Sequence, residues 1–234
     1  MTKKILLEPA LVLHRRPFKE TSLIVDFFTK SKGRISAIAK GAKRPKSALR
    51  LLQTPAALLS VSFSGKGSLM NVSHCEIDHL FSLDSSSLSS LVYLNELLTK
   101  FLEKEDPHTE IFNQYLSVCE LLETKSTDQI EKSLREFELI LLREIGYGIN
   151  LDSDYSTEGP IMKEKNYAFF PLSGFKETKS IKGIRGEDIV NFSRGNFEEI
   201  STRRSAKKIM REAIDFHLGN KKLNLRKFLK KKGG

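Results

Sequence analysis

Apolar and polar positions alternate along the first 80 residues, and short runs of Gly, Pro, Ser and Asn separate the alternating stretches. Alternation with a period of two is typical of β-strands that bury one face. Five short strands in an open sheet would leave two exposed edges, and closure into a barrel removes them. The pattern therefore predicts a small closed β-barrel, with strands at Ile5–Leu13, Ser22–Thr29, Gly33–Ala39, Ala56–Phe63 and Ser68–His74.

The period of the apolar pattern changes at Asp84, after which apolar residues recur every three or four positions, as on one face of an α-helix. Asp84 or Ser85 is suited to begin the first helix, because a short polar side chain accepts hydrogen bonds from unpaired backbone N–H groups. Gly146 and Gly148 are suited to end the third helix. The pattern predicts helices at about 85–104, 109–123, 127–145, 187–192 and 202–217, and a last short basic helix at 221–232.

These patterns divide the chain into a barrel domain over residues 1–80 and a mostly α-helical domain over residues 81–234. From about 150 to 186 the helical period fades, and turn-forming residues surround the apolar run Tyr167–Phe170. We interpret this stretch as an irregular insertion that contains a hairpin. The predicted fold class is therefore α+β, with more than one domain.

The formal charge of +10 is distributed unevenly, because it is +9 over residues 1–80, −10 over 81–160 and +11 over 161–234. Two basic regions separated by an acidic helical block indicate a polyanionic partner, and nucleic acid is the leading candidate. The chain has no apolar run of the roughly 20 residues that a membrane span needs, and its N-terminus does not resemble a signal peptide. We therefore expect a cytoplasmic protein.

The stretch Lys30–Arg50 contains eight Lys and Arg and no Asp or Glu. Its middle alternates as a half-buried strand does, so the flanking charges would be attached to the barrel. Further cations lie between the first two strands and, at helical spacing, along one face of the helix predicted at 202–217. Phe18 is the aromatic side chain that we expect to be exposed for base stacking. The candidate DNA contacts are Arg15, Arg16, Lys19, Lys32, Arg34, Lys40, Lys43, Arg44, Lys46, Arg203, Arg204, Lys207, Lys208 and Arg211, and a solvated basic surface is the alternative.

Signatures of catalysis and of metal binding are weak. Gly65–Ser68 lacks the spacing of a phosphate-binding loop, and Asp152–Ser156 is not followed by the glycine and glutamate of a calcium loop. His74–His79 contains metal-ligating residue types, but no second close Cys or His pair follows, so ordinary strand-end residues are the preferred interpretation. Cys75 and Cys119 are expected to be free and buried. No feature of the sequence indicates an enzyme.

Three segments carry a resemblance to a known family. The first runs from Leu11 to Leu23 and on through Gly33-Arg34 to Ala39–Ala42, the second joins Phe137–Leu139 to Gly146–Gly148, and the third joins Arg204–Lys207 to His217–Gly219 and Leu223. Together they cover nearly the whole chain and resemble the RecO family of bacterial recombination mediator proteins. The resemblance implies an N-terminal OB-fold barrel, a mostly helical C-terminal domain and a role in recombinational DNA repair.

Members of that family bind single-stranded (ss) and double-stranded (ds) DNA, anneal complementary strands covered by single-stranded-DNA-binding protein (SSB), and act with RecR to help load RecA. The resemblance therefore implies a DNA-binding mediator, associated with the nucleoid, that hydrolyses no nucleotide. Many relatives carry a four-cysteine zinc module, but Asn150–Gly174 of this chain has no cysteine, so we expect no zinc and no other cofactor. Only Arg226 matches the family's C-terminal motif, and it joins the candidate DNA contacts.

The family's helical domain receives the acidic C-terminal tail of SSB. Such a peptide requires an apolar groove with a cation at its mouth. The segment Leu134–Phe137 matches the family, and Arg135 is therefore nominated as the partner of the tail carboxylate. The alternative is a helix-surface arginine that pairs with Glu131 or Glu138.

Three other functions stay open at this level. An RNA-binding barrel protein would have the same composition, and would differ by contacts to the 2′-hydroxyl. A metal-dependent nuclease could use carboxylates that are scattered along the sequence. A scaffold could use the basic regions to bind an acidic protein rather than DNA.

Overall fold

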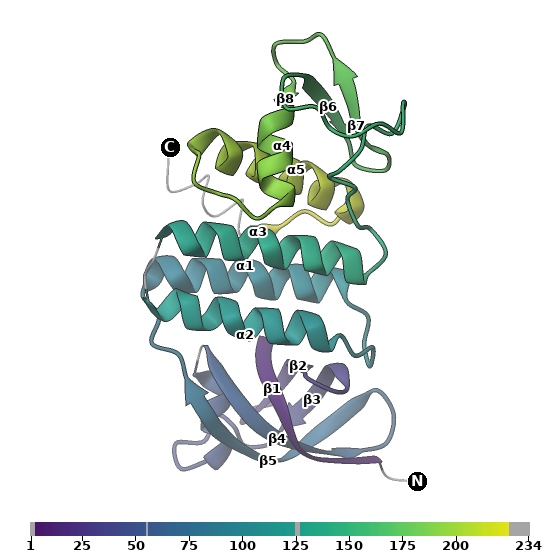
Figure 1. Ribbon diagram of the computed structural model, residues 1–234. Coiled ribbons are helices and arrows are strands. Elements are labelled where there is room, and N and C mark those ends of the chain that lie inside the picture. The colour runs from purple at the N-terminus through teal and green to yellow at the C-terminus, as the bar shows by residue number, and fades with distance from the viewer. Residues whose placement is uncertain (1–2, 55, 125–126, 225–234) are drawn as a thin grey trace. The chain divides into compact units, whose positions relative to one another are not determined.

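The computed structural model describes residues 3–54, 56–124 and 127–224 (Figure 1). The chain forms two compact units. Among the described residues, unit 1 contains those up to Thr124 together with Leu223 and Asn224, and unit 2 contains those from 127 to 222. Among the described helices, none is long and apolar enough to cross a membrane.

Unit 1 begins with a five-stranded barrel. Each strand is hydrogen-bonded to two neighbours in the ring order β1-β2-β3-β5-β4, and all pairs are antiparallel except β3 with β5. A short 3₁₀ helix, η1 (Ala48–Gln53), lies between β3 and β4 and was not predicted from the sequence. The strands are β1 (Lys3–Phe18), β2 (Ser22–Thr29), β3 (Gly33–Ala39), β4 (Ala57–Gly65) and β5 (Leu69–Leu80).

The apolar residues of the alternating pattern fill the barrel. Phe27 on β2 and Phe63 on β4 are fully buried and meet edge to face, with ring centroids 5.2 Å apart. Ala10, Ala37 and other small residues are buried in the same core as these rings. The predicted bounds of β2 and β3 agree with the structure, whereas β1 and β5 extend further than the alternation indicated.

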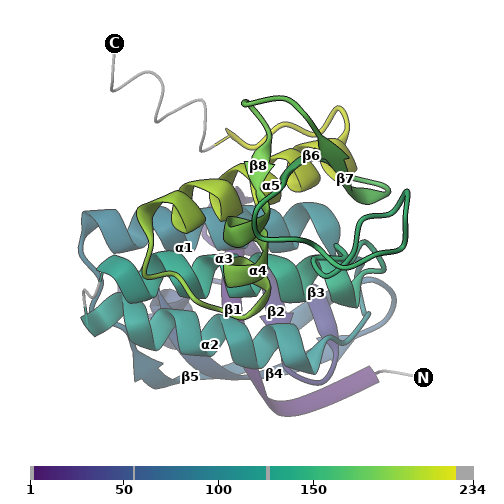
Figure 2. The ribbon, with the colours of Figure 1, turned by 45° about the horizontal axis from the view of Figure 1, so that its top comes forward.

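Helices α1 (Ser85–Phe101) and α2 (Thr109–Thr124) also belong to unit 1 and run side by side (Figure 1 and Figure 2). Asp84 begins α1 as expected, because its side chain accepts hydrogen bonds from the backbone N–H groups of Ser86 and Ser87. Phe28 of β2 packs on Phe112 of α2, with ring centroids 5.5 Å apart. These contacts attach the two helices to one end of the barrel.

Unit 2 contains α3 (Thr127–Glu144), α4 (Gly186–Ser193) and α5 (Ile200–Leu218), with α5 packed on both α3 and α4. The buried carboxylate of Asp188 joins α4 to α5, because it accepts hydrogen bonds from the hydroxyl groups of Ser201, Thr202 and Ser205. The helices predicted at 127–145, 187–192 and 202–217 are present with bounds that differ by one or two residues, and most of the helix predicted at 221–232 lies outside the described residues.

The predicted insertion is a three-stranded sheet in the order β7-β6-β8, with β6 (Asn166–Phe170) and β7 (Gly174–Thr178) forming the expected hairpin and β8 (Ile184–Arg185) pairing with β6 (Figure 2). Asp154 fastens the preceding loop to this hairpin. Its carboxylate accepts hydrogen bonds from the N–H and hydroxyl of Ser156 and from the N–H of Glu177, each at 2.7 Å.

The boundary between the two compact units differs from the predicted domain boundary, which separated residues 1–80 from 81–234. Secondary structure changes from strand to helix where β5 ends at Leu80. The boundary between the compact units lies later, after α2, because α1 and α2 pack with the barrel.

Candidate nucleic-acid interface

The turn between β1 and β2 meets the loop that follows β3 at one end of the barrel. The N–H of Lys43 donates to the carbonyl oxygen of Thr21 at 2.9 Å, and the N–H of Gly41 donates to the hydroxyl of Ser22 at 3.4 Å. Lys19 and Gly41 both have positive φ, of 51° and 71°, which turns the chain sharply in the two segments. Two groups of cations that are about 20 residues apart in the sequence are thereby brought together.

These segments surround a hollow of about 510 Å³, which we call the basic hollow. Three exposed cations and one half-buried aromatic ring contribute to its lining, and no lining residue is acidic. The ammonium group of Lys19 lies 5.6 Å from the centroid of the Phe18 ring. The residues that line the basic hollow are Phe18, Lys19, Thr21, Ser22, Ile38, Lys40, Gly41, Arg44 and Asn71.

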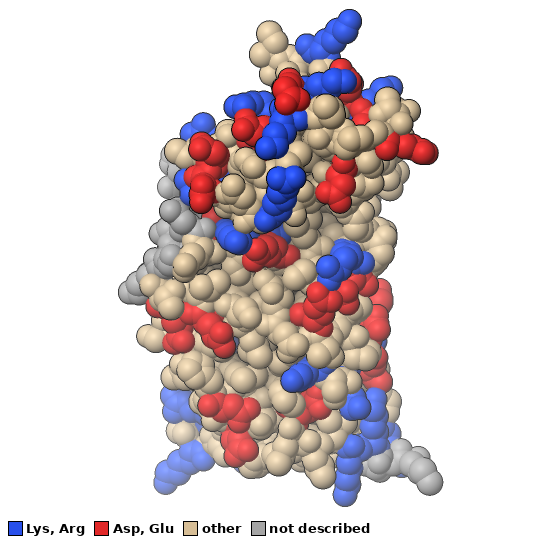
Figure 3. Space-filling model, viewed as in Figure 1, with Lys and Arg blue, Asp and Glu red and all other residues tan. Residues whose placement is uncertain are grey.

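This arrangement suits a single-stranded polyanion. Lys19, Lys40 and Arg44 are able to neutralise phosphates, and the Phe18 ring offers a flat surface for an unpaired base. Arg16 is exposed near the end of β1, and Lys43 and Lys46 are exposed in the segment between β3 and β4. These cations add to the positive charge of the segments that form the basic hollow. On the face drawn in Figure 3, Lys and Arg side chains project from the barrel and a further group lies over unit 2.

Sequence reasoning missed Thr21, Ser22 and Asn71 as lining residues. Asn71 reaches the basic hollow because β5 pairs in parallel with β3, with Asn71 beside Ile38. Parallel pairing between strands more than 30 residues apart leaves no local signal in the sequence. Ser22 was correctly predicted as the first residue of a strand, but the sequence does not show how the turn before this strand lies relative to the later loop.

Other predicted contacts lie elsewhere on the barrel. Arg15 lines a different hollow, formed with α1, and its guanidinium donates to the carbonyl oxygen of Leu52 at 3.5 Å. Lys32 is exposed in the turn between β2 and β3, which is at the far end of these strands from the basic hollow. The structure therefore separates Arg15 and Lys32 from the group around Lys19.

Arg34 requires a correction, because its side chain is only 9% exposed. Its guanidinium donates to the carbonyl oxygens of Thr99 at 2.7 Å and Leu102 at 2.6 Å, at the C-terminal end of α1. Burial lowers the pKa of Arg34, and the carboxylates of Asp26 and Glu103 oppose this shift. Arg34 fastens α1 to the barrel and is not available to DNA phosphates.

The predicted basic face of α5 is present in unit 2. The apolar residues from Ala206 to Ile214 are buried, while Arg204, Lys207, Lys208 and Arg211 are exposed and Arg203 is half-buried. Arg211 also lies 3.8 Å from the carboxylate of Asp215. The exposed cations provide a second positive surface in the molecule. Arg226, the remaining candidate, lies outside the described residues.

Arg135 also requires a correction. Its side chain on α3 is 9% exposed and lies 2.9 Å from the carboxylate of Glu138, which is fully buried. This is the pairing with Glu138 that was the alternative interpretation. A buried, paired guanidinium is not a cation at the mouth of a surface groove, so Arg135 is removed as the partner of a peptide carboxylate.

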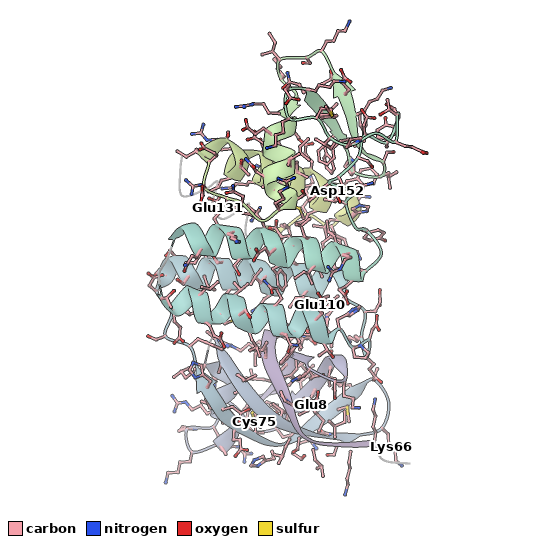
Figure 4. The ribbon with its side chains drawn as sticks, viewed as in Figure 1. Glu8, Lys66, Cys75, Glu110, Glu131 and Asp152 are labelled. Carbon is pink, nitrogen blue, oxygen red and sulfur yellow. The ribbon has the colours of Figure 1, made fainter. Side chains whose placement is uncertain are left out.

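Burial changes the acidity of the two cysteines. Burial, with Asp78 and Glu76 nearby, raises the pKa of Cys75 to about 12, and burial likewise raises the pKa of Cys119 well above its usual value. Both thiols are free and buried, as expected. Cys75 is seen on β5 in Figure 4.

In the described part of the chain, no three His, Cys, Asp or Glu side chains are grouped to hold a metal ion.

A five-stranded barrel with a basic hollow, an aromatic ring at its edge and helices attached to it is typical of proteins that bind oligonucleotides. Comparisons with known proteins assign the chain to a family. The model of the family described as "Recombination protein O N terminal" matches residues 1–81, and that described as "Recombination protein O C terminal" matches residues 82–227. The chain therefore belongs to the RecO family, and its barrel is the OB-fold of that family.

Relatives with the name "DNA repair protein RecO" match most of the chain. The protein from Ralstonia nicotianae is 35% identical over 228 residues, which cover 95% of this chain and 83% of the relative. The protein from Polynucleobacter asymbioticus is 36% identical over 230 residues, covering 95% and 94%. That from Actinobacillus pleuropneumoniae serotype 7 is 36% identical over 218 residues, covering 92% and 90%. These findings support a role in DNA repair.

Proposed function

We propose that this protein binds ssDNA and dsDNA and brings complementary strands together during recombinational repair. The observation that carries the proposal is the basic hollow, in which three exposed cations surround an aromatic ring and no carboxylate is present. Phosphate neutralisation by Lys and Arg supplies affinity without sequence preference, which is what a strand-annealing protein requires. Phe18 adds stacking with an unpaired base.

Annealing requires that two strands be held at once. The basic hollow of unit 1 and the exposed cations of α5 in unit 2 are two separate positive surfaces on one chain, which supports the proposal that each holds a strand. Following the family resemblance, we further propose that the substrate is DNA coated with SSB, and that the protein acts with RecR to help load RecA.

The proposed activity is one of binding and not of catalysis. Strand pairing is favourable once the strands are aligned, so the protein needs neither nucleotide hydrolysis nor a metal cofactor to promote it. Incubation with labelled DNA, Mg²⁺ and ATP should give annealed product without strand cleavage and without release of phosphate.

Binding to a labelled 20-nucleotide ssDNA tests the basic hollow directly. The triple variant Lys19→Ala, Lys40→Ala, Arg44→Ala should bind at least about tenfold more weakly than the wild type at moderate salt, because three phosphate contacts are lost. A matched control, Lys4→Ala, Lys30→Ala, Lys66→Ala, removes the same charge from exposed lysines outside the hollow; Lys66 is labelled at the β4–β5 turn in Figure 4. Equal losses in both variants would contradict the proposal.

Annealing of SSB-coated complementary strands tests the finer function. The wild type should accelerate annealing, and the triple variant should not. Acceleration that is the same on bare and on coated DNA, or that is lost only in the control variant, would argue against the proposed role.

A further inference from the structure

A cluster of exposed aromatic residues in unit 2 is not explained by the basic surfaces. The segment that leaves α3 passes the C-terminal end of α5 on its way to the β6–β7 hairpin (Figure 1). There the rings of Tyr147 and His217 stack, with centroids 4.1 Å apart and an interplanar angle of 10°. Two segments that the sequence singled out, around Gly146–Gly148 and His217–Gly219, are thus in direct contact.

The stack is held from both sides. The His217 ring hydrogen-bonds to the backbone of Pro171, whose only polar backbone group is its carbonyl, and Phe216 meets the same ring edge-on at 5.2 Å. Burial lowers the pKa of His217, and the hydrogen bond to Pro171 opposes this shift. The lowered pKa favours the neutral form of the imidazole that stacks on Tyr147.

The outer faces of this cluster are open to solvent. Tyr147 is 45% exposed, Phe216 49% and Phe170 44%, and Tyr155 packs edge-on against Phe170 at 5.8 Å. Leu172, two residues after Phe170, is 77% exposed. Exposed apolar side chains that gather in one place mark a binding surface more often than a folding contact. We call Tyr147, Tyr155, Phe170, Phe216 and His217 the aromatic cluster.

The charge around the aromatic cluster indicates the occupant. Lys221 and Lys222 are exposed and follow His217 within five residues, and neither forms an ion pair in the part of the chain that the structure describes. Arg211 precedes Phe216 by five residues, about 7.5 Å along the helix and about 140° around its axis, and it lies 3.8 Å from the carboxylate of Asp215, so Lys221 and Lys222 are the cations next to the cluster. Flat aromatic faces next to cations are the combination that binds unpaired bases together with their phosphates.

We propose that the aromatic cluster stacks with unpaired bases of ssDNA while the cations of α5 and of the turn after it bind the phosphates. This proposal rests on the proposed DNA-binding function and adds a base-stacking site in unit 2 to it. The site favours ssDNA over dsDNA, because paired bases present no free face to Tyr147. The basic hollow of unit 1 would remain available for a second strand.

The test compares oligonucleotides that differ only in their bases. The double variant Tyr147→Ala, Phe216→Ala is titrated with a 20-nucleotide oligothymidine and with an abasic strand of equal length, which keeps the phosphates. We expect about tenfold weaker binding to oligothymidine, in line with roughly 1–3 kcal/mol per stacked base, and less than a twofold change on the abasic strand and on dsDNA. Tyr147→Phe should bind as the wild type does.

A matched control removes exposed apolar side chains that are not aromatic from the same unit. Ile181 and Ile200 are 96% and 57% exposed, and the variant Ile181→Ala, Ile200→Ala should bind both strands unchanged. Equal loss on oligothymidine and on the abasic strand, or no loss in the double variant, overturns the stacking proposal. If the wild type itself fails to bind oligothymidine, the proposed DNA-binding function fails instead.

A second measurement covers the case in which the double variant does not fold. The protein has no tryptophan, so Tyr147→Trp introduces a single reporter into the aromatic cluster. Its emission should be quenched on binding to oligothymidine and should change little on binding to the abasic strand. Unchanged emission while oligothymidine binds would overturn the proposal.

Discussion

The two ends of the β2–β3 ladder have similar basic sequences but different environments. At one end, Lys19 and Lys40 lie beside the open basic hollow. At the other end, Gly33 and Arg34 lie under the segment that joins α1 to α2, and the N–H of Glu105 donates to the carbonyl oxygen of Arg34 at 3.0 Å. A side chain added at Gly33 would collide with the backbone of Asp106, at 2.1 Å.

This comparison shows that a cation's role depends on what packs over it. Arg34 is buried by residues that come more than 60 positions later, and it satisfies carbonyl groups at the end of a helix, where positive charge is favourable. Lys40 has no such cover and stays exposed. One end of the barrel is therefore built for attachment of the helices, and the other end is free to bind a ligand.

The largest expected effect is at the covered end. Arg34→Ala leaves the carbonyl groups of Thr99 and Leu102 without their donor and opens a void, so the free energy of unfolding should fall by about 3 kcal/mol. Urea unfolding followed by circular dichroism measures this change. Lys32→Ala, at an exposed position two residues earlier, should change stability by less than about 0.5 kcal/mol. Similar stability of the two variants would contradict the assignment of Arg34 as a structural residue.

A buried acid in unit 2 extends the comparison to another contact between distant segments. Burial by itself raises the pKa of Asp154, but hydrogen bonds from the Ser156 hydroxyl and from the N–H groups of Glu177, Ser156 and Thr157 outweigh it, so the pKa lies below its usual value. A depressed pKa stabilises the fold above the pKa of the unfolded chain, near 3.9, and this stability is lost as the pH falls through the lower folded value.

Asp154→Asn should therefore lower the free energy of unfolding by about 2 kcal/mol at pH 7, since the amide nitrogen would face an N–H donor. The difference between wild type and variant should shrink as the pH is lowered below about 4. Thermal unfolding at pH 7 and at pH 3 measures both values. A difference that is the same at the two pH values would show that the ionised carboxylate is not the fastening group.

A smaller effect on stability than at Arg34 or Asp154 is expected at the open end. Phe18 is half-buried at the edge of the basic hollow, so Phe18→Ala should lower the free energy of unfolding by no more than about 1 kcal/mol. Its affinity for ssDNA should nevertheless fall about fivefold, because one stacking surface is lost. Fluorescence anisotropy with a labelled oligonucleotide measures the affinity. An unchanged affinity would remove Phe18 from the interface.

The local features of the fold were readable from the sequence. Alternation located β2 and β3, and Asp84 marked the start of α1. The environment of the cations was not readable, because the sequence around Lys32 and Arg34 does not show which of the two side chains is covered by the end of α1. Likewise, no local pattern shows that Asn71 lies beside Ile38 or that Tyr147 stacks on His217. Each depends on contacts between distant segments.

The salt dependence of ssDNA binding tests the central claim most directly. Each phosphate neutralised on a single strand contributes about 0.7 to the slope of log affinity against log salt concentration. If Lys19, Lys40 and Arg44 each contact a phosphate, their joint replacement by alanine should make that slope shallower by about 2, and the control at Lys4, Lys30 and Lys66 should leave it unchanged. Parallel slopes for the wild type and the triple variant would contradict the assignment of the basic hollow as the DNA-binding site.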